Sequence, residues 1–197
     1  MCYIASMSLK AAILGFVALE PTSGYTLKQR FDGSLRSFWT ATQSQVYREL
    51  HQLERDGLLA VERTPGDGKP DRKIYSLTQR GRMALAQWLT EAPEPLMLRH
   101  PLLLKLVFAA DLPSRDLDAV LARYADGVAA SRAEYAQRLD EPRIFSLARS
   151  EREQRLWRLA IEHGLAWCDM ELEWLTKARR ELALQRKEST RWTRKAK

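Results

Sequence analysis

The segment TQSQVYRELHQLERDGLL covers residues 42–59, and its opening turns carry five hydrogen-bonding side chains, Gln43, Ser44, Gln45, Tyr47 and Arg48. No acidic residue accompanies them in the first turn of the expected helix. Acidic side chains normally favour this end of a helix, because the helix dipole is positive there. An acid-free end rich in donors is therefore typical of a surface that meets a polyanion. Arg48 suits either role on such a surface, bidentate pairing with guanine or a clamp on phosphate.

The apolar residues of this segment recur with helical spacing. Val46, Leu50 and Leu53 lie at i, i+4 and i+7 and predict a buried stripe. Two roles fit Gln45 equally: contact with a base, or a capping box in which Thr42 and Gln45 bond each other at the helix start. At about 100° of rotation per residue, the face opposite the stripe carries Ser44, Arg48, His51 and Arg55, with Gln45 and Tyr47 at its flanks.

The elements around this helix follow a recognisable order. Residues 8–19 and 22–31 predict two helices before it, and residues 78–91 predict one more after it. Between them, LLAVERT and RKIYSLT predict two strands joined by the turn-rich loop PGDGKPD. This order predicts a winged helix-turn-helix, whose third helix enters the major groove of DNA. The side chains expected to pack inward from the flanking helices are Tyr25, Leu27, Phe31, Leu85, Trp88 and Leu89.

Basic residues gather at the predicted wing, the hairpin of residues 58–78. Lys69 lies in its loop, and Arg72 and Lys73 begin its second strand. A wing meets the DNA backbone or the minor groove, so we expect these three cations to contact phosphates. Tyr47 is expected to pack its ring on the base of the wing and to direct its hydroxyl to the backbone of the DNA.

The segments SLKAAILGFVALEPTSGYTLKQRF, SQVYRELHQLERDGLL and RKIYSLTQRGRMAL together resemble the PadR family of bacterial transcriptional regulators. The Gly-Tyr pair of the second helix, the run Tyr-x-x-Leu-x-x-Leu-Glu-x-x-Gly-Leu and the run Tyr-x-Leu-Thr-x-x-Gly after the wing carry the resemblance. The second half, from HPLLLKLVFAADL to GLAWCDMELEWLTKAR, resembles the helical C-terminal domain of the longer, virulence-activator-like members. The resemblance implies a dimeric regulator that is usually a repressor and is sometimes released by a small aromatic or lipophilic molecule.

The last predicted helix, residues 150–184, is apolar on two faces. One stripe contains Leu156, Ala160, His163, Trp167, Met170 and Trp174. A helix that is apolar on two faces must bury both, and a second copy of the chain is the natural cover for one of them. A homodimer would bind a two-fold palindrome with half-sites about one helical turn, ~34–36 Å, apart. The residues predicted at the dimer interface belong to the other stripe and are Ile161, Leu165, Cys168, Leu172 and Leu175.

Three tryptophans of this helix have two interpretations. Trp157, Trp167 and Trp174 could line a pocket for a flat aromatic effector, or they could pack in the core of an interface, where large aromatic residues are common. Core packing is the favoured interpretation. His163 has no Cys, Asp or His at metal-ligand spacing, so no metal site is expected.

Composition narrows the class of protein. The 197 residues are 45% hydrophobic, enough to bury a core, and no apolar run approaches the ~20 residues of a membrane span. From residue 176 to the end, nine Lys or Arg and two Glu supply the whole net charge of +7. The two cysteines are too few for a disulfide framework. The lack of a membrane span and of a disulfide framework predicts a cytoplasmic location. No nucleophile–base set or Gly-rich phosphate loop is present, so we expect no enzyme and no cofactor.

The expected fold is therefore mainly α-helical, with a winged helix-turn-helix domain followed by an α-helical dimerisation domain. We place the first domain at residues 8–91, the second at residues 92–184, and a basic, disordered tail at residues 185–197. Double-stranded DNA is the expected partner, with no role for a membrane. The alternative is a winged-helix module that docks a protein instead of DNA, which the acidic Asp67 and Asp71 of the wing also fit.

Overall fold

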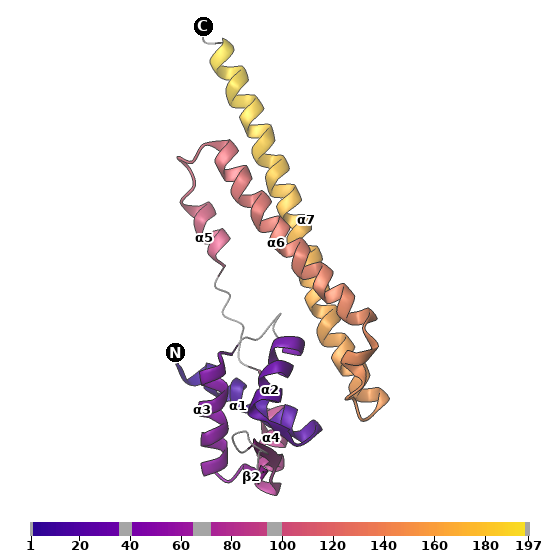
Figure 1. Ribbon diagram of the computed structural model, residues 1–197. Coiled ribbons are helices and arrows are strands. Elements are labelled where there is room, and N and C mark those ends of the chain that lie inside the picture. The colour runs from indigo at the N-terminus through magenta and orange to yellow at the C-terminus, as the bar shows by residue number, and fades with distance from the viewer. Residues whose placement is uncertain (1, 36–40, 65–71, 94–99, 196–197) are drawn as a thin grey trace. The chain divides into compact units, whose positions relative to one another are not determined.

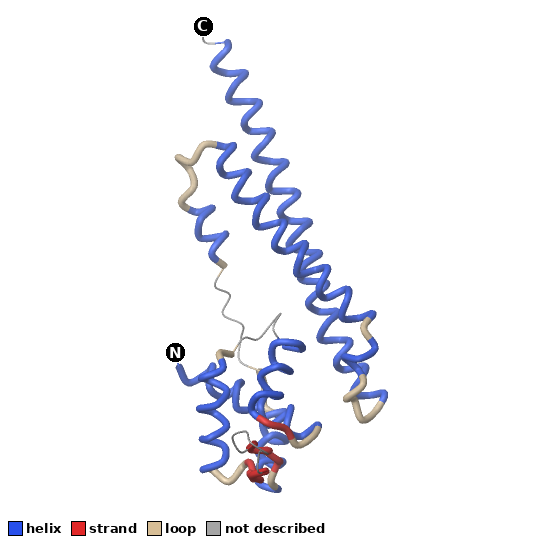
Figure 2. The backbone as a smooth tube through the Cα atoms, in the orientation of Figure 1, coloured by secondary structure: helices blue, strands red, loops and turns tan. Residues whose placement is uncertain are grey.

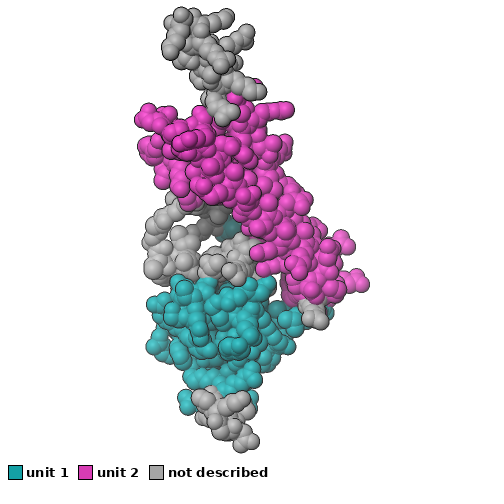
Figure 3. Space-filling model, turned by 45° about the horizontal axis from the view of Figure 1, so that its top comes forward, with its two compact units in different colours: residues 1–94, 147–149 teal, residues 95–146, 150–197 magenta. Residues whose placement is uncertain are grey.

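The computed structural model describes residues 2–35, 41–64, 72–93 and 100–195. The chain divides into two compact units (Figure 3). Unit 1 contains residues 1–94 together with residues 147–149, and unit 2 contains residues 95–146 and 150–197.

Unit 1 has the predicted order of three helices, a hairpin and a fourth helix (Figure 1). Gly57, with φ of 67°, ends α3 in the left-handed conformation that its position predicted. Thr78 begins α4, and its hydroxyl accepts a hydrogen bond from the N–H of Gly81. The elements of unit 1 are α1 (Cys2–Leu19), β1 (Thr22–Ser23), α2 (Gly24–Arg30), a π turn (Phe31–Leu35), α3 (Gln43–Arg55), β2 (Leu59–Thr64), β3 (Arg72–Leu77) and α4 (Gln79–Thr90).

The sheet of unit 1 has three antiparallel strands in the order β1-β3-β2 (Figure 2). Tyr75 of β3 lies between Thr22 of β1 and Val61 of β2. The sequence predicted only the hairpin, because a two-residue strand has no alternation to detect. Ser23 also caps α2, since its hydroxyl accepts the N–H of Thr26 at 3.2 Å. The strand pairing therefore ties the start of α2 to the base of the wing.

A hydrophobic core from α1, α2, α3 and the sheet holds unit 1 together. Leu27 and Phe31 are buried in it, as predicted. Tyr25 is 64% exposed and Leu89 is 67% exposed, so the prediction that they pack inward is wrong. Trp88 is also exposed, at 39%. The remaining buried members of this core are Leu9, Ile13, Leu14, Val17, Val46, Leu50, Leu53, Leu58, Leu59 and Tyr75.

Unit 2 is helical and contains α5 (Pro101–Val107), α6 (Ser114–Asp140), a 3-10 turn (Pro142–Phe145) and α7 (Glu151–Lys195). Helices α6 and α7 run side by side in opposite directions (Figure 1). The backbone of α7 stays helical to Lys195, through the segment for which a disordered tail was predicted.

Close contacts hold the α6–α7 hairpin in register. A Cβ atom placed on Gly164 of α7 would lie 2.3 Å from the ring of Tyr135 on α6, so only glycine leaves room for that ring. Arg179 binds Asp118 through two hydrogen bonds of 2.6 and 3.1 Å, and Arg132 pairs with Asp169. Within the described parts of the chain, no helix is both long and apolar enough to cross a membrane.

Candidate nucleic-acid interface

Helix α3 presents the polar face that its spacing predicted. Val46, Leu50 and Leu53 are fully buried in unit 1. The side chains of the opposite face, which are all exposed, are Ser44, Arg48, His51 and Arg55. The first turn of α3 contains no acid, so the positive end of its dipole is uncompensated. A polyanion meeting this face would encounter hydrogen-bond donors and positive charge.

The first turn of α3 is organised by a capping box. The N–H of Thr42 donates to Gln45 Oε1 at 2.8 Å, and the N–H of Gln45 donates to Thr42 Oγ1 at 3.3 Å. The hydroxyl of Ser44 lies 3.0 Å from that of Thr42. Of the two roles predicted for Gln45, base contact and helix capping, the free protein therefore shows helix capping. A base contact by Gln45 would require its side chain to leave the cap.

Arg48 is exposed on the second turn of α3, next to the half-buried Glu49. Burial raises the pKa of the Glu49 carboxyl, and the nearby cations Lys10 and Arg48 act in the opposite direction. Arg48 therefore supplies a positive charge on the exposed face, with the side chain of Glu49 turned partly into the protein.

Tyr47 is half-buried, and its ring packs on the start of α2. A Cβ atom on Gly24 would lie 2.8 Å from Tyr47 Cε1, so the ring lies against the first residue of α2. Gly24 is the Gly of the Gly-Tyr pair, and its missing side chain creates the space for Tyr47. Tyr47 also raises the pKa of Tyr75 in β3, after burial and Glu54, so its hydroxyl lies near the second strand of the wing.

Arg72 and Lys73 both have polar contacts within unit 1. The Arg72 guanidinium lies 3.4 Å from the hydroxyl oxygens of Ser23 and Thr26, at the start of α2. Lys73 Nζ lies 3.4 Å from Glu54 Oε2 on α3. Lys69, the third predicted phosphate contact, lies outside the described residues.

Glu54 belongs to the run Tyr-x-x-Leu-x-x-Leu-Glu-x-x-Gly-Leu, but the sequence reasoning assigned it no role. The same Oε2 atom that pairs with Lys73 also lies 3.6 Å from His51 Nδ1 on the exposed face of α3. Burial and the charge of Glu54 raise the pKa of Tyr75, which lies in β3 two residues after Lys73. The carboxylate of Glu54 therefore links His51, on the exposed face of α3, to Lys73, on the second strand of the wing.

In unit 2, the predicted dimer-interface stripe faces inward. Ile161, Cys168 and Leu175 are buried in the core that α7 forms with α6, and Leu165 and Leu172 are packed against that core. Ile161, Cys168 and Leu175 are therefore already covered within one chain, which argues against them as the surface between two copies, whereas Leu165 and Leu172 are only partly buried. The physical reason is that the complementary residues of α6, such as Leu121, Val128 and Tyr135, select this face of α7.

The other apolar stripe of α7 is the exposed one. Leu156 is 54% exposed, Met170 is 52% exposed and Trp167 is 38% exposed, and Leu159, which lies beside the predicted stripe, is also 54% exposed. Trp157 and Trp174 instead pack partly buried against the unit 2 core. The three tryptophans consequently do not form one cluster, and core packing describes two of them.

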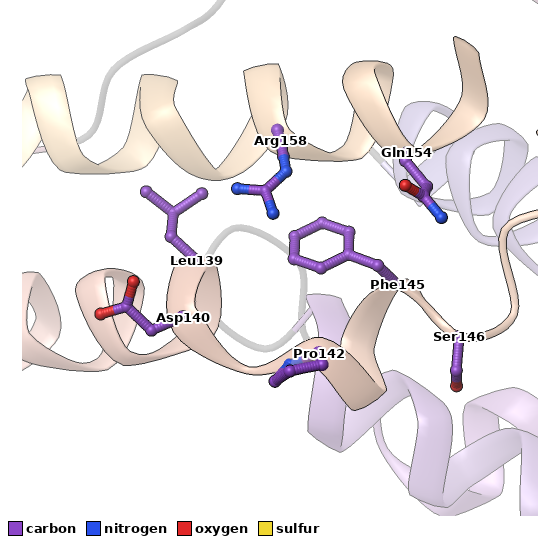
Figure 4. Close-up of a pocket in the computed structure, with 7 residues that line it drawn as sticks. All are labelled: Leu139, Asp140, Pro142, Phe145, Ser146, Gln154 and Arg158. Atoms are coloured by element: carbon purple, nitrogen blue, oxygen red, sulfur yellow. The ribbon is translucent and has the colours of Figure 1, made fainter. Parts of the chain in front are cut away.

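A shallow pocket of about 290 Å³ lies where α6 turns into α7 (Figure 4). The Arg158 guanidinium lies 4.5 Å from the centre of the Phe145 ring, and the two side chains converge with Leu139 in the view of Figure 4. None of the three tryptophans lines this pocket. Its full lining is Leu139, Asp140, Pro142, Phe145, Ser146, Gln154 and Arg158.

A polar cluster is buried in unit 2. His100 Nε2 lies 3.0 Å from Glu171 Oε1 and 3.1 Å from the Tyr124 hydroxyl, and the N–H of Leu103 donates to His100 Nδ1 at 3.4 Å. Burial and a hydrogen bond to Glu171 raise the pKa of the Tyr124 hydroxyl. This cluster fixes the start of α5 against α7. Among the described residues, no group of three or more His, Cys, Asp or Glu side chains is placed to hold a metal.

Two family models cover most of the chain. Residues 13–87 match the transcriptional regulator PadR-like family, and residues 98–183 match the family described as virulence activator alpha C-term. The chain is 39% identical over 89 residues to a probable transcriptional regulator, Rv1176c, of Mycobacterium tuberculosis. These matched residues make up 45% of this chain and 47% of that protein. It is 34% identical over 109 residues to the negative transcriptional regulator PadR of Bacillus subtilis. These matched residues make up 55% of this chain and 60% of that protein. The chain therefore spans about half the length of these relatives.

Solved structures of the Bacillus subtilis protein share the fold. Its complex with operator DNA superposes with a TM-score of 0.77 over 89% of this chain and 99% of that one, at 24% identity. Its complex with p-coumaric acid gives a TM-score of 0.72 over 89% and 98% of the two chains, at 25% identity. The matched region includes both the winged helix and the helical hairpin.

Proposed function

Since residues 13–87 and 98–183 match these two family models, the chain belongs to the PadR-like family of transcriptional regulators, and we propose that it regulates transcription by binding double-stranded DNA. In this proposal α3 enters the major groove and the wing holds the phosphate backbone.

The exposed face of α3 carries the proposal. Its buried stripe fixes which residues point outward, and the residues that point outward are donors with a cation, Arg48, on the second turn. Arg48 is proposed to reach the edge of a base, and Ser44, Gln45 and Tyr47 to contact the DNA beside it. Arg72, Lys73 and Lys69 are proposed to hold phosphates, because a compact ammonium or an exposed guanidinium suits that role.

We propose that the protein acts as a repressor whose DNA binding is released by a small aromatic acid. The negative regulator among the relatives supports the direction of regulation. The structure of that regulator with p-coumaric acid supports the class of effector. The pocket at the α6–α7 turn offers a guanidinium beside an aromatic ring, which are the groups that such an acid needs.

The proposed assembly is a homodimer through unit 2, with a corrected interface. The stripe of Leu156, Leu159, Trp167 and Met170 is exposed in the single chain and needs a cover. Leu156, Trp167 and Met170 lie on the repeat 156/160/163/167/170, whose steps of four and three are typical of a coiled-coil seam, and Leu159 lies beside it. A second copy that applies the same stripe would bury both, and the operator would then be a two-fold palindrome.

A selection experiment tests the proposal. Purified protein is mixed with a random DNA library, and the bound DNA is sequenced. A palindromic motif, with affinity that falls steeply as salt rises, is expected because phosphate contacts release counterions. DNA binding that is absent at low salt would favour the alternative, a winged helix that docks a protein. Addition of p-coumaric acid to the complex then tests the effector.

A further inference from the structure

Glu54 lies where a protein that must bind a polyanion would be expected to avoid negative charge. It sits on the last turn of α3, and its Oε2 atom lies 3.4 Å from Lys73 Nζ on the wing. The two side chains are 34% and 30% exposed, so the pair is partly open to water. Partly exposed ion pairs are weak enough for a competing anion to break.

We propose that Glu54 is a specificity-determining residue that holds Lys73 away from DNA until α3 is correctly seated. While Lys73 is paired with Glu54, its charge is compensated and it gains little from a phosphate. On DNA of the wrong sequence α3 does not settle into the groove, and Lys73 stays with Glu54. On the operator the seated helix brings a phosphate close to the wing, and Lys73 exchanges the carboxylate for that phosphate.

The position of Glu54 favours this role over a purely structural one. Strand β3 is already fixed by its pairing with β1 and β2, and the Thr78 hydroxyl ties the end of the wing to the carbonyl oxygens of Gly57 and Leu58 at 2.8 and 3.0 Å. The Glu54–Lys73 pair is therefore not needed to hold the wing. After Lys73 departs, Glu54 keeps His51, 3.6 Å away on α3, as its neighbour. The inference rests on the proposed DNA binding of unit 1.

The test compares Glu54→Gln with the native chain on a random-sequence duplex of about 30 base pairs, roughly three helical turns. The amide keeps the size of the side chain and removes its charge. Glu54→Gln is expected to bind this duplex about two- to fivefold more tightly, the range that partly exposed ion pairs span. The slope of log affinity against log salt should steepen by about one unit, because one more phosphate is contacted. Binding to the selected operator should change less, so specificity falls.

Two further variants separate the possible causes. Glu91→Gln removes one acid from the end of α4 and should leave the affinities for both duplexes unchanged. A higher affinity of Glu91→Gln for random DNA would mean that the effect of Glu54→Gln comes from net charge alone. In Glu54→Gln/Lys73→Ala the gain on random DNA should disappear, because the freed lysine is absent. A gain that persists in the double variant, or no gain in a folded Glu54→Gln whose native parent binds DNA, would overturn the role of Glu54. A native protein that binds neither duplex would overturn the proposed function and this inference with it.

Discussion

Met170→Glu should separate two copies of the chain without unfolding either of them. Met170 is 52% exposed on α7, so a glutamate there stays in water in the single chain. In the proposed dimer the half of the side chain that is still exposed becomes buried. Full burial of such a side chain contributes about 1.5–3 kcal/mol, so the loss is about 1 kcal/mol in each copy. Each dimer also acquires two carboxylates in its interface, and removing an ion from water costs several kcal/mol.

The dimer should therefore lose at least about 4 kcal/mol, close to a thousandfold in its dissociation constant, because 1.4 kcal/mol corresponds to about tenfold. Sedimentation velocity at micromolar concentration measures the change, and far-UV circular dichroism reports whether the helices persist. Thr176→Glu is the matched control, since Thr176 is exposed on α7 and lies six residues, about 120° of helix rotation, away from Met170. It should leave the dimer intact.

Leu172→Glu should behave differently from Met170→Glu, because Leu172 packs against the core inside one chain. It should lower the melting temperature of the hairpin and not merely separate two copies. A native protein that sediments as a monomer, or a Met170→Glu variant that remains a dimer, would refute the assignment of the exposed stripe. A folded monomer produced by Leu172→Glu alone would restore the stripe that the sequence first suggested.

Other outcomes follow from single contacts. Gly164→Ala should destabilise unit 2 by about 1–3 kcal/mol through overpacking. Gly127→Ala has nothing within 4 Å of the added Cβ and should stabilise unit 2 by up to about 1 kcal/mol. Urea unfolding measures the change in the free energy of unfolding, which should have opposite signs in the two variants. Arg48→Ala should cost about 1–3 kcal/mol on the operator and relax one base position per half-site, and an equal loss on random DNA would make Arg48 a phosphate clamp. Glu171→Ala should cost about 1–3 kcal/mol, because it leaves the buried His100 without its carboxylate, and Glu171→Gln should cost less in the same thermal melt.

The order of elements in unit 1 could be predicted because each has its own local signal. The apolar spacing of α3, the glycine at its end and the turn-rich loop of the wing act within a few residues. The two-residue strand β1 could not be found in this way, since its pairing with β3 joins residues about 50 positions apart. The exposure of Tyr25 has a similar cause: α2 is only seven residues long, and its contacts with α1, α3 and β3 decide which of its sides is covered.

The faces of α7 show where periodicity stops being informative. Both stripes have helical spacing, so α7 alone does not reveal which one α6 covers. The choice depends on partners about 30 to 60 residues away, such as Tyr135 against Gly164 and Asp118 with Arg179. The pair of Glu54 and Lys73 is of the same kind, because it exists only once the wing has folded back beside α3.

Charge in unit 1 makes dimerisation a requirement for the proposed function. The net charge of +7 belongs to residues 176–197, and the rest of the chain sums to zero. Of the described cations that we propose to contact DNA, Lys73 is paired with Glu54 in the free protein, and the other two are Arg48 and Arg72. Two or three phosphate contacts give a salt slope of only about −2 to −3 and weak binding. Linking two copies makes the second contact intramolecular and can raise affinity by about 10²–10⁴-fold. Met170→Glu should therefore roughly halve the salt slope on the operator and abolish tight binding, although α3 and the wing remain unchanged; a variant that is monomeric and still binds the operator tightly would show that one copy is sufficient.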